Sequence, residues 1–357
     1  MLKSKVFYCP VPAKSSLKER DAAMKKILSK IEFDKIVSKH DKVAVKTHIG
    51  DTNNDTHIPP KLIAMVVQEI KKYNALPYIT ETSTLYSGPR SNAISHLELA
   101  EKHGFTFEKI GAPFIMSDGL FGNTEIEVPI KGILFDKVNI ARDAVLTDAL
   151  VVISHPTGHM LSGIGACLKN LGMGLASRKG KMLQHSSIKP FIKPHECTLC
   201  GQCIKWCPVK CIIEEGGKAF IQEDSCIGCG ECLTLCKFSA VKFNWGIGSI
   251  DIQKSIAEYA LGAVQNKRDK SLFINVLVDM TKECDCMSIK QTPIIGDIGI
   301  LASTDPVAID KATLDLTGKA NKENLSEISH PSIDPDIQLK HAEKIGLGSR
   351  TYELIEV

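Results

Sequence analysis

The chain of 357 residues lacks three features that would place it in a familiar class. Its 44 basic and 41 acidic residues nearly cancel, so it has no basic footprint for a nucleic acid. Its amino-terminal segment, MLKSKVFYCPVPAK, lacks the apolar core of a secretory signal. No apolar run approaches the length of a membrane span. We therefore expect a cytoplasmic protein that binds neither nucleic acid nor membrane.

Two nucleotide-binding signatures are also missing, although residues 153–174, ISHPTGHMLSGIGACLKNLGMG, are rich in glycine. GIGACL lacks the third glycine of the dinucleotide fingerprint, and no G-K-[ST] follows as in a phosphate loop. Glycines allow the backbone to approach a ligand or a partner helix closely. We therefore count Gly158, Gly163 and Gly165 as candidate cofactor-binding positions without expecting a nicotinamide site.

Cysteine is abundant, with thirteen residues. In a chain of this length without a secretory signal, metal binding or catalysis explains them better than disulfides do. Eight of them form two copies of the spacing C-x2-C-x2-C-x3-C, offset by 29 residues. The first copy is Cys197, Cys200, Cys203 and Cys207, followed by Pro208. The second copy is Cys226, Cys229, Cys232 and Cys236.

This spacing is typical of a bacterial ferredoxin module with two [4Fe–4S] clusters. Three thiolates two residues apart wrap one cubane, and the fourth ligates the other cluster. We therefore assign one cluster to Cys197, Cys200, Cys203 and Cys236. The second cluster takes Cys226, Cys229, Cys232 and Cys207. Zinc is disfavoured, because zinc sites rarely use three cysteines of one such run. We interpret Cys211 as a packed thiol.

The flanking sequence alternates short apolar runs with amphipathic segments. We expect strands at Val43–Thr47, Pro77–Thr82, Ala149–Ser154, Leu272–Val278 and Ile298–Ala302. We expect helices at Pro59–Tyr73, Asn92–His103, Ile250–Gln265 and Asp305–Leu316. This alternation predicts an α/β body with a mostly parallel sheet and helices on both faces. The body takes residues 1–189 and 245–357, and the inserted ferredoxin module takes residues 190–244; a three-domain chain is the alternative.

Ligands bind beyond the carboxyl ends of strands in open α/β sheets, so these ends supply the candidate catalytic residues. Five expected strands end in polar or nucleophilic groups, which suggests one shared cleft. The first carries Lys46 and His48, the second ends at 81–83, and the third is followed by His155 and His159. The fourth precedes Asp279 and the C-x-C of Cys284 and Cys286. The fifth ends at 303–305, where Asp305 is also a natural helix N-cap.

Each candidate has more than one interpretation. His155 and His159 could donate protons, ligate a metal or contact an anion. Lys169 and Asn170 could contact an anionic group, but tight helix packing with a surface lysine fits the sequence equally well. Cys284 and Cys286 could be a redox-active dithiol, a pair of metal ligands or a nucleophile, or two unrelated thiols. We favour a functional role for this pair.

Six strings in order resemble one family of iron–sulfur proteins, that of domain of unknown function 362. They are VKTHIGD, ETSTLYSG, SHPTGHMLSGIGACLKNLGMGLASRKGK, the cysteine repeat, ECDCM and DIGILASTDPVAID. The resemblance implies an α/β body with an inserted dicluster ferredoxin module. It also implies that the candidate lysines, histidines and C-x-C thiols lie in recurring motifs, without giving their roles.

Two functions follow from these patterns. The first is a low-potential oxidoreductase whose clusters relay electrons to a cleft in the α/β body, for a small-molecule substrate, a cofactor or a further metal centre. An additional metal or organic cofactor in the body belongs to this hypothesis. The second is a non-catalytic electron carrier whose body docks a partner oxidoreductase. Both require an electron donor or acceptor protein, and a homodimer is compatible with either.

Overall fold

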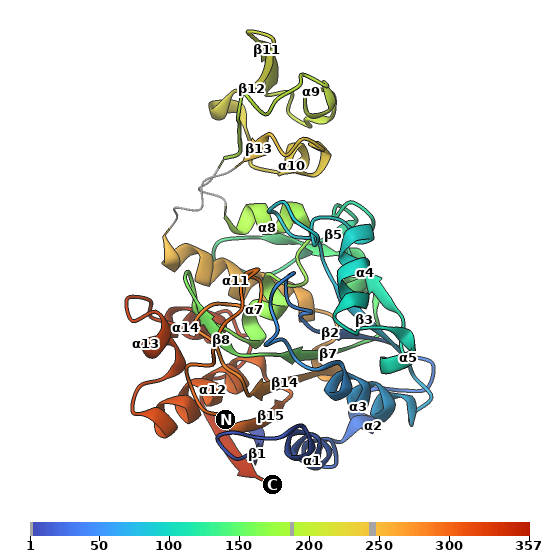
Figure 1. Ribbon diagram of the computed structural model, residues 1–357, viewed down its shortest axis with the longest axis vertical. Helices are drawn as coiled ribbons and strands as arrows, with labels where there is room; N and C mark the ends of the chain where they lie inside the picture. Colours follow the sequence, from blue (N-terminus) through green and yellow to red (C-terminus); the bar gives the residue numbers. More distant parts are fainter. Residues whose placement is uncertain (1–2, 186–188, 243–247) are drawn as a thin grey trace.

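A computed structural model describes residues 3–185, 189–242 and 248–357. Its centre is an eight-stranded sheet in the order β16-β1-β15-β14-β7-β2-β3-β4. The strands are β1 (Ser4–Pro10), β2 (Lys42–Lys46), β3 (Leu76–Glu81), β4 (Phe114–Met116), β7 (Ala149–Ser154), β14 (Ser271–Leu277), β15 (Gly299–Ser303) and β16 (Tyr352–Glu356). Since β1 pairs with β16, the two ends of the chain lie side by side at one edge of the sheet (Figure 1).

The sheet is mostly parallel. Strands β14, β7, β2, β3 and β4 are parallel neighbours, and β1 is parallel to β16. Only β15 is reversed within this sheet, because it pairs antiparallel with both β14 and β1. Every residue of β7 and β14 is buried. Continuous apolar strands of this kind are expected where helices cover both faces of a sheet.

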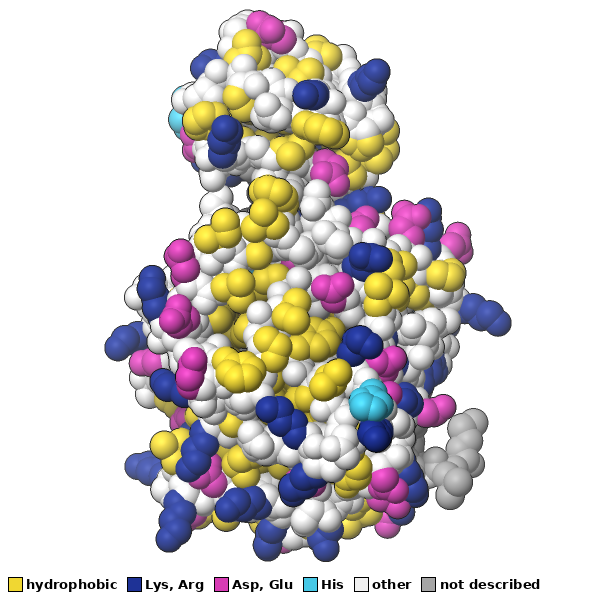
Figure 2. All heavy atoms as spheres, turned by 90° about the vertical axis from the view of Figure 1, so that its right-hand side faces the viewer, with side chains coloured by type: hydrophobic (Ala, Val, Ile, Leu, Met, Phe, Trp, Pro, Cys, Tyr) yellow, Lys and Arg dark blue, Asp and Glu magenta, His cyan; other side chains and the backbone are white. Residues whose placement is uncertain are grey.

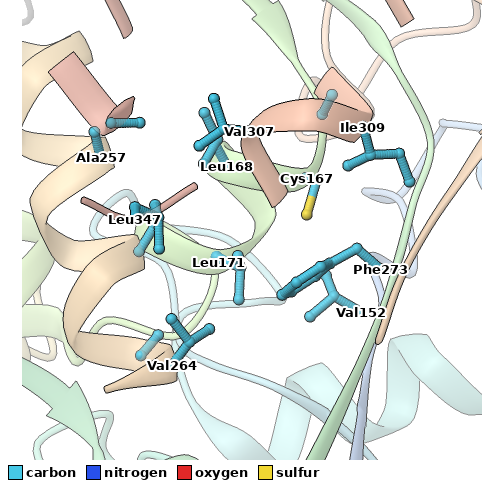
Figure 3. Close-up of a cluster of buried hydrophobic side chains, with 14 of the residues drawn as sticks. Val152, Cys167, Leu168, Leu171, Ala257, Val264, Phe273, Val307, Ile309 and Leu347 are labelled. Carbon is cyan, nitrogen blue, oxygen red and sulfur yellow. The ribbon is translucent and has the colours of Figure 1, made fainter. Parts of the chain in front are cut away.

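Helices lie on both faces of the sheet (Figure 1). Helices α1 (Leu17–Leu28), α2 (Phe33–Ile36), α3 (Pro60–Lys71) and α5 (Phe107–Ile110) share one apolar core with the sheet. Helices α7 (Cys167–Gly172), α11 (Ser249–Val264), α12 (Pro306–Asn321) and α14 (Asp336–Lys344) share the core of the opposite face. In that second core, Leu168 and Leu171 of α7 and Val307 of α12 pack toward Val152 and Phe273 of the sheet (Figure 3).

Smaller elements complete the body. They are α4 (Ala93–Lys102), α6 (Arg142–Leu146), α8 (Arg178–Gln184), α13 (Leu325–Ser329), the hairpin of β5 (Glu125–Pro129) and β6 (Lys137–Ala141), and the hairpin of β8 (Thr157–His159) and β9 (Gly163–Gly165). Among the described residues, no helix is long and apolar enough to cross a bilayer.

Residues 190–242, here called the cysteine lobe, contribute no described strand to the central sheet and project beyond α8 (Figure 1). Figure 2 shows the lobe as a separate mass above the body. It contains β10 (Phe191–Ile192), α9 (Gln202–Trp206), β11 (Ile212–Glu215), β12 (Lys218–Ile221), the 3-10 turn η1 (Glu223–Ser225), α10 (Glu231–Leu235) and β13 (Val241–Lys242). Strands β11 and β12 form a hairpin between the two cysteine runs.

The lobe repeats its backbone conformation at the offset of the cysteines. Helix α10 lies 29 residues after α9, and both follow a left-handed glycine, Gly201 and Gly230. Positive φ angles recur at Leu199 and Gly228, at 51° and 66°. A leucine with positive φ is uncommon, because its Cβ crowds the backbone. The duplication seen in the sequence is therefore also a duplication of local structure.

The expected α/β fold with a mostly parallel sheet is confirmed. All nine strands and helices expected in the body are present; α12 ends five residues later than expected, and the other ends lie within two residues of those expected. Asp305 caps α12 as expected, accepting hydrogen bonds from the backbone of Val307 and Ala308. The expectation that five strand ends meet in one cleft is wrong for β15. This strand runs antiparallel to its neighbours, so its carboxyl end lies beside their amino ends.

The contact between α7 and α11 gives a stability prediction. A Cβ atom at Gly172 would lie 2.1 Å from the backbone oxygen of Ile256, a contact that forces the helices apart. Gly172→Ala should lower the free energy of unfolding by about 1–3 kcal/mol in urea denaturation, despite the better helix propensity of alanine. Gly248→Ala is the matched control, since nothing lies within 4 Å of its Cβ position. Equal stability of the two variants would contradict the prediction.

Candidate functional site

A cavity of about 710 Å³ lies beyond the carboxyl ends of β2, β3, β7 and β14. Open α/β sheets bind their ligands beyond the carboxyl ends of their strands. The lining includes the candidates Lys46, His48, His155, His159, Gly165, Lys169, Asn170, Cys284 and Cys286. Residues far apart in the sequence therefore meet in one cavity, as four of the expected strand ends predict.

Two candidate glycines lie outside the lining. A Cβ at Gly158 would lie 2.1 Å from the backbone oxygen of Lys282, and one at Gly163 would lie 2.3 Å from Oγ of Ser326 in α13. These positions illustrate the other use of glycine, close approach between segments of the chain. Their predicted contact with a cofactor stays a prediction.

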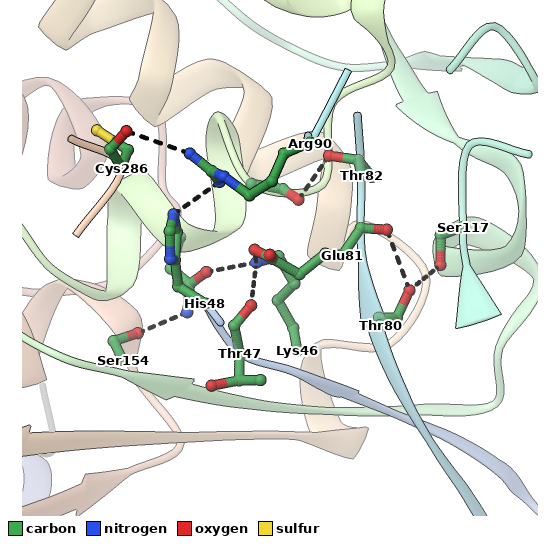
Figure 4. Close-up of polar contacts among 12 residues, drawn as sticks. Lys46, Thr47, His48, Thr80, Glu81, Thr82, Arg90, Ser117, Ser154 and Cys286 are labelled. Atoms are coloured by element: carbon green, nitrogen blue, oxygen red, sulfur yellow. Dashed lines mark hydrogen bonds and ion pairs between the residues drawn. The ribbon is translucent and has the colours of Figure 1, made fainter. Parts of the chain in front are cut away.

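Lys46 is fully buried at the floor of the cavity. Its ammonium donates to Oε1 of Glu81 at 3.1 Å, to Oδ1 of Asn170 at 2.7 Å and to the backbone oxygen of Thr47 at 2.6 Å (Figure 4). An ammonium has three protons, so these contacts use all of them. Burial lowers the pKa of Lys46, and Glu81 opposes this shift. In this arrangement Lys46 is an internal ion-pair partner.

Glu81 connects Lys46 to a second buried base, His96 in α4. Oε2 of Glu81 lies 3.0 Å from Nε2 of His96. Burial raises the pKa of Glu81, but the charge of Lys46 and the hydrogen bond with His96 outweigh it and hold this pKa well below its usual range. The carboxylate is therefore ionised at neutral pH, between the lysine and the imidazole.

His155 and Asp285 form a second buried ion pair. Nδ1 of His155 donates to the carboxylate at 2.7 Å, and Nε2 donates to the backbone oxygen of Val278 at 2.7 Å. Two acceptors require two N–H groups, so the ring is an imidazolium. Burial alone would lower the pKa of His155, but Asp285 raises it above its ordinary value. Both ring N–H groups of His155 therefore face protein acceptors, and through Asp285 the ring holds the Cys284–Cys286 loop in place.

The other two candidate histidines are neutral. Burial lowers the pKa of His48 to about 3, and Nη1 of Arg90 lies 3.0 Å from its Nε2 (Figure 4). Burial and the neighbouring Lys169 hold the pKa of His159 well below its usual range. Nδ1 of His159 accepts from the backbone N–H of Ser162 at 3.1 Å, so its proton resides on Nε2. His159 therefore lines the cavity as a neutral imidazole with its donor at Nε2.

The C-x-C thiols lie in the cavity wall beside a lysine. Nζ of Lys169 donates to Sγ of Cys284 at 3.2 Å, and the backbone N–H of Cys286 donates to the same sulfur at 3.3 Å. The hydrogen bond from the Cys286 thiol and the charge of Lys169 lower the pKa of Cys284 to about 5. Cys284 is therefore a thiolate at neutral pH, and the pKa of Cys286 is raised. Lys169 thus contacts an anionic group, and that group belongs to the protein.

Several lining residues were not expected from the sequence. Arg90 donates to Asp51 at 2.9 Å and to the backbone oxygen of Cys286 at 3.3 Å, so it joins two loops of the cavity. Lys181 lies on α8, and its pKa is lowered to about 7 by burial, against the charge of Asp118. Arg90 follows β3 by nine residues, and Lys181 lies in a helix. Neither position carries a strand-end signal in the sequence.

The predicted ligand sets are gathered in the cysteine lobe. Burial and the neighbouring thiols of Cys236, Cys200 and Cys197 raise the pKa of Cys203, which places the four predicted partners of the first set in one neighbourhood. The second set, Cys207, Cys226, Cys229 and Cys232, lines one small cavity together with Cys211. As the side chains stand, no group of three or more His, Cys, Asp or Glu among the described residues has an arrangement that could hold a metal ion.

The ion pair beneath the C-x-C loop gives a pH prediction. The charge on Asp285 stabilises the fold above about pH 4 and is lost as pH falls through its lowered pKa; the charge on His155 acts below about pH 6.5 and is lost as pH rises through its raised pKa. Asp285→Asn should therefore lower the free energy of unfolding at about pH 6 by about 3–5 kcal/mol in urea denaturation. The loss should shrink above the raised pKa of His155.

Asp55→Asn is the control for this prediction, because Asp55 is exposed and its ion pair is with the exposed Lys290. Its loss should be below about 1 kcal/mol at either pH. A pH-independent effect of Asp285→Asn would contradict the charged His155–Asp285 pair.

Comparisons with known proteins give a family. No curated protein matches the chain. Among solved structures, the lactate racemase apoprotein from Thermoanaerobacterium thermosaccharolyticum is similar, with 14% identity, a TM-score of 0.42, and coverage of 78% of this chain and 51% of that chain. A protein from Thermotoga maritima has 12% identity, a TM-score of 0.41, and coverage of 87% and 59%. The chain thus spans about half to three-fifths of their lengths. Residues 43–315 match the family described as "Domain of unknown function (DUF362)", and the chain belongs to this family.

Proposed function

We propose that the chain is an iron–sulfur electron-transfer protein that acts as an oxidoreductase. The cysteine lobe is an inserted ferredoxin-type module that holds two [4Fe–4S] clusters, and electrons from it reduce a substrate, a cofactor or a further metal centre in the cavity. The observation that carries this proposal is the contact between the cysteine lobe and the cavity wall.

That contact is made by α10, the helix between Cys229 and Cys236. Leu233 of α10 packs with Leu85 and Met182, and Leu85 lines the cavity. Ser239 of the lobe accepts a hydrogen bond from Ser87 at 3.1 Å, and Ser87 also lines the cavity. The cysteine lobe, which is the proposed electron source, therefore contacts the wall of the cavity, which is the proposed site of reduction.

The donor set of the lobe fits cubane clusters. Eight thiols stand at ferredoxin spacing, four of them line one small cavity, and Cys203 contributes to the raised pKa of Cys232, which supports two neighbouring ligand sets. Backbone N–H groups of Leu199 and Gly228 donate to the sulfurs of Cys197 and Cys226, each at 3.4 Å. Such donors stabilise thiolates and tune cluster potentials.

Each cluster would supply one electron at a time. The residues of the chain itself bind and orient the group to be reduced. His159 offers a proton at Nε2, Lys169 stabilises negative charge on sulfur, and the buried pair Lys46–Glu81 fixes the floor of the cavity. A pure carrier needs no such cavity, which is why the oxidoreductase is preferred to the carrier. A separate electron-donor protein would reduce the clusters of the lobe again.

Anaerobic reconstitution of the full chain with iron and sulfide tests the proposal. Iron quantification should give about eight irons per chain, and the reduced protein should show the electron paramagnetic resonance signal of [4Fe–4S] clusters. Binding of about one zinc per cysteine run, or no incorporation of iron, would contradict it. An iron content clearly above eight would indicate an additional iron centre.

A further inference from the structure

We infer that Cys284 and Cys286 are a redox-active dithiol that reduces the disulfide bond of a small molecule in the cavity. This inference deepens the proposed function by naming the group that receives the electrons and the class of substrate. It rests on how the loop is held, where the two thiols lie, and what surrounds the first of them.

The middle residue of the C-x-C anchors the loop to the body. The carboxylate of Asp285 contacts His155 at 2.7 Å, Thr56 at 2.9 Å and Asn54 at 3.0 Å. Its backbone oxygen accepts from the N–H of Asp51 at 3.0 Å. Since the Asp285 side chain is held in the buried network, the loop has little freedom to carry its two cysteines out of the cavity wall.

The two cysteines on either side of this anchor both line the cavity. The backbone N–H of Cys286 donates to Sγ of Cys284 at 3.3 Å, so the loop turns the first sulfur toward the second cysteine. Cys284 is 6% exposed and Cys286 is partly exposed. A pair used only for packing would have no reason to face a cavity of about 710 Å³.

The two thiols have different environments, as a thiol–disulfide reductase requires. Cys284 receives hydrogen bonds from Lys169 and from the backbone of Cys286. A thiolate is the attacking species in disulfide exchange, and a neighbouring cation maintains it. The raised pKa of Cys286 keeps that residue protonated until the second step. Cys284 is therefore the attacking thiolate and Cys286 the resolving thiol.

The reaction balances as follows. The Cys284 thiolate attacks one sulfur of the substrate, a mixed disulfide forms, and the first substrate thiolate leaves and takes up a proton. Cys286 then attacks Sγ of Cys284 and gives its proton to the second substrate sulfur, which leaves as a thiol while the Cys284–Cys286 disulfide forms. Two electrons from the cysteine lobe and one proton restore the thiolate and thiol. The sum is one disulfide, two electrons and two protons giving two thiols.

Trapping the mixed disulfide tests the first half of this cycle in the full chain. Bis(2-hydroxyethyl) disulfide is a small uncharged probe that the cavity can admit. Cys286→Ser should accumulate a covalent adduct on Cys284, detected by mass spectrometry of proteolytic peptides. Cys284→Ser should form no adduct in this loop. Cys9→Ser added to Cys286→Ser is the control, because Cys9 is buried away from the cavity and its loss should leave the adduct on Cys284 unchanged.

A pH series gives a readout that a packing role would not change. Adduct formation in Cys286→Ser should rise with pH while the Cys284 thiol ionises, and adding Lys169→Met should move the midpoint upward. The inference is overturned if Cys284 forms no adduct, or if the midpoint pH of adduct formation is the same with and without Lys169→Met.

These outcomes are separable from the proposed function, because the trapping reaction needs no electrons from the lobe. Adduct formation on Cys284 without iron incorporation would overturn the proposed function and leave the dithiol. Eight bound irons with an unreactive Cys284 would overturn the dithiol and leave the proposed function.

Discussion

Replacing Cys229 with alanine should lower the iron content of the reconstituted chain from about eight to about four per chain. The reason is that Cys229 belongs to one ligand set alone, the set that lines the small cavity of the cysteine lobe. Cys203→Ala should remove the other cluster to the same extent, and the double variant should bind almost no iron. Iron and sulfide quantification after anaerobic reconstitution measures each result.

The control for these variants is another thiol of the same cavity. Sγ of Cys211 lies 3.5 Å from Sγ of Cys207, but Cys211 falls outside both copies of the spacing. Cys211→Ala should therefore keep about eight irons per chain. A halved iron content in Cys211→Ala, or an unchanged content in Cys229→Ala, would contradict the assignment of ligands.

Lys46→Met should lower the free energy of unfolding by about 3–5 kcal/mol, a large part of the stability of a typical domain. The change leaves the Glu81 carboxylate buried beside His96 without its main counter-charge. Lys46→Met combined with Glu81→Gln should lose less stability than Lys46→Met alone, because the second change removes the unpaired charge. Urea denaturation of the three proteins at about pH 7 measures the difference.

The same variants tell an ion-pair partner from a proton donor. If Lys46 acts mainly in the fold, the double variant should recover stability and keep the exchange reaction of Cys284. Lys46→Met with unchanged stability but no reactivity at Cys284 would contradict this account. It would indicate that Lys46 takes part in the reaction.

The sequence predicts the body of the fold well because its central strands are buried on both faces. β7 and β14 read as continuous apolar runs, and their order with helices implies parallel pairing. The direction of β15 could not be predicted in this way, since a short apolar strand has the same pattern in either direction. The edge strand β16 and its neighbour β1 are less buried, and they pair with each other across the two ends of the chain.

The candidate site could likewise be predicted from the sequence only in part. Strand-end reasoning located Lys46, His155 and Cys284, which meet in one cavity. It could not show that both ring protons of His155 are used, because the acceptor Val278 is 123 residues away in the chain. It also could not find Arg90, which reaches the cavity from a loop. Tertiary contacts of this kind leave no periodic signal in a sequence.

The central claim is that electrons from the cysteine lobe leave through the cavity thiols. Its most direct test is to reduce the reconstituted chain, mix it anaerobically with bis(2-hydroxyethyl) disulfide, and follow the visible absorbance of the clusters in a stopped-flow instrument. The account predicts that the absorbance returns in the wild-type protein and returns far more slowly in Cys284→Ser, which should bind the same amount of iron. Clusters that stay reduced in the wild type, or that reoxidise equally fast in both proteins, would contradict it.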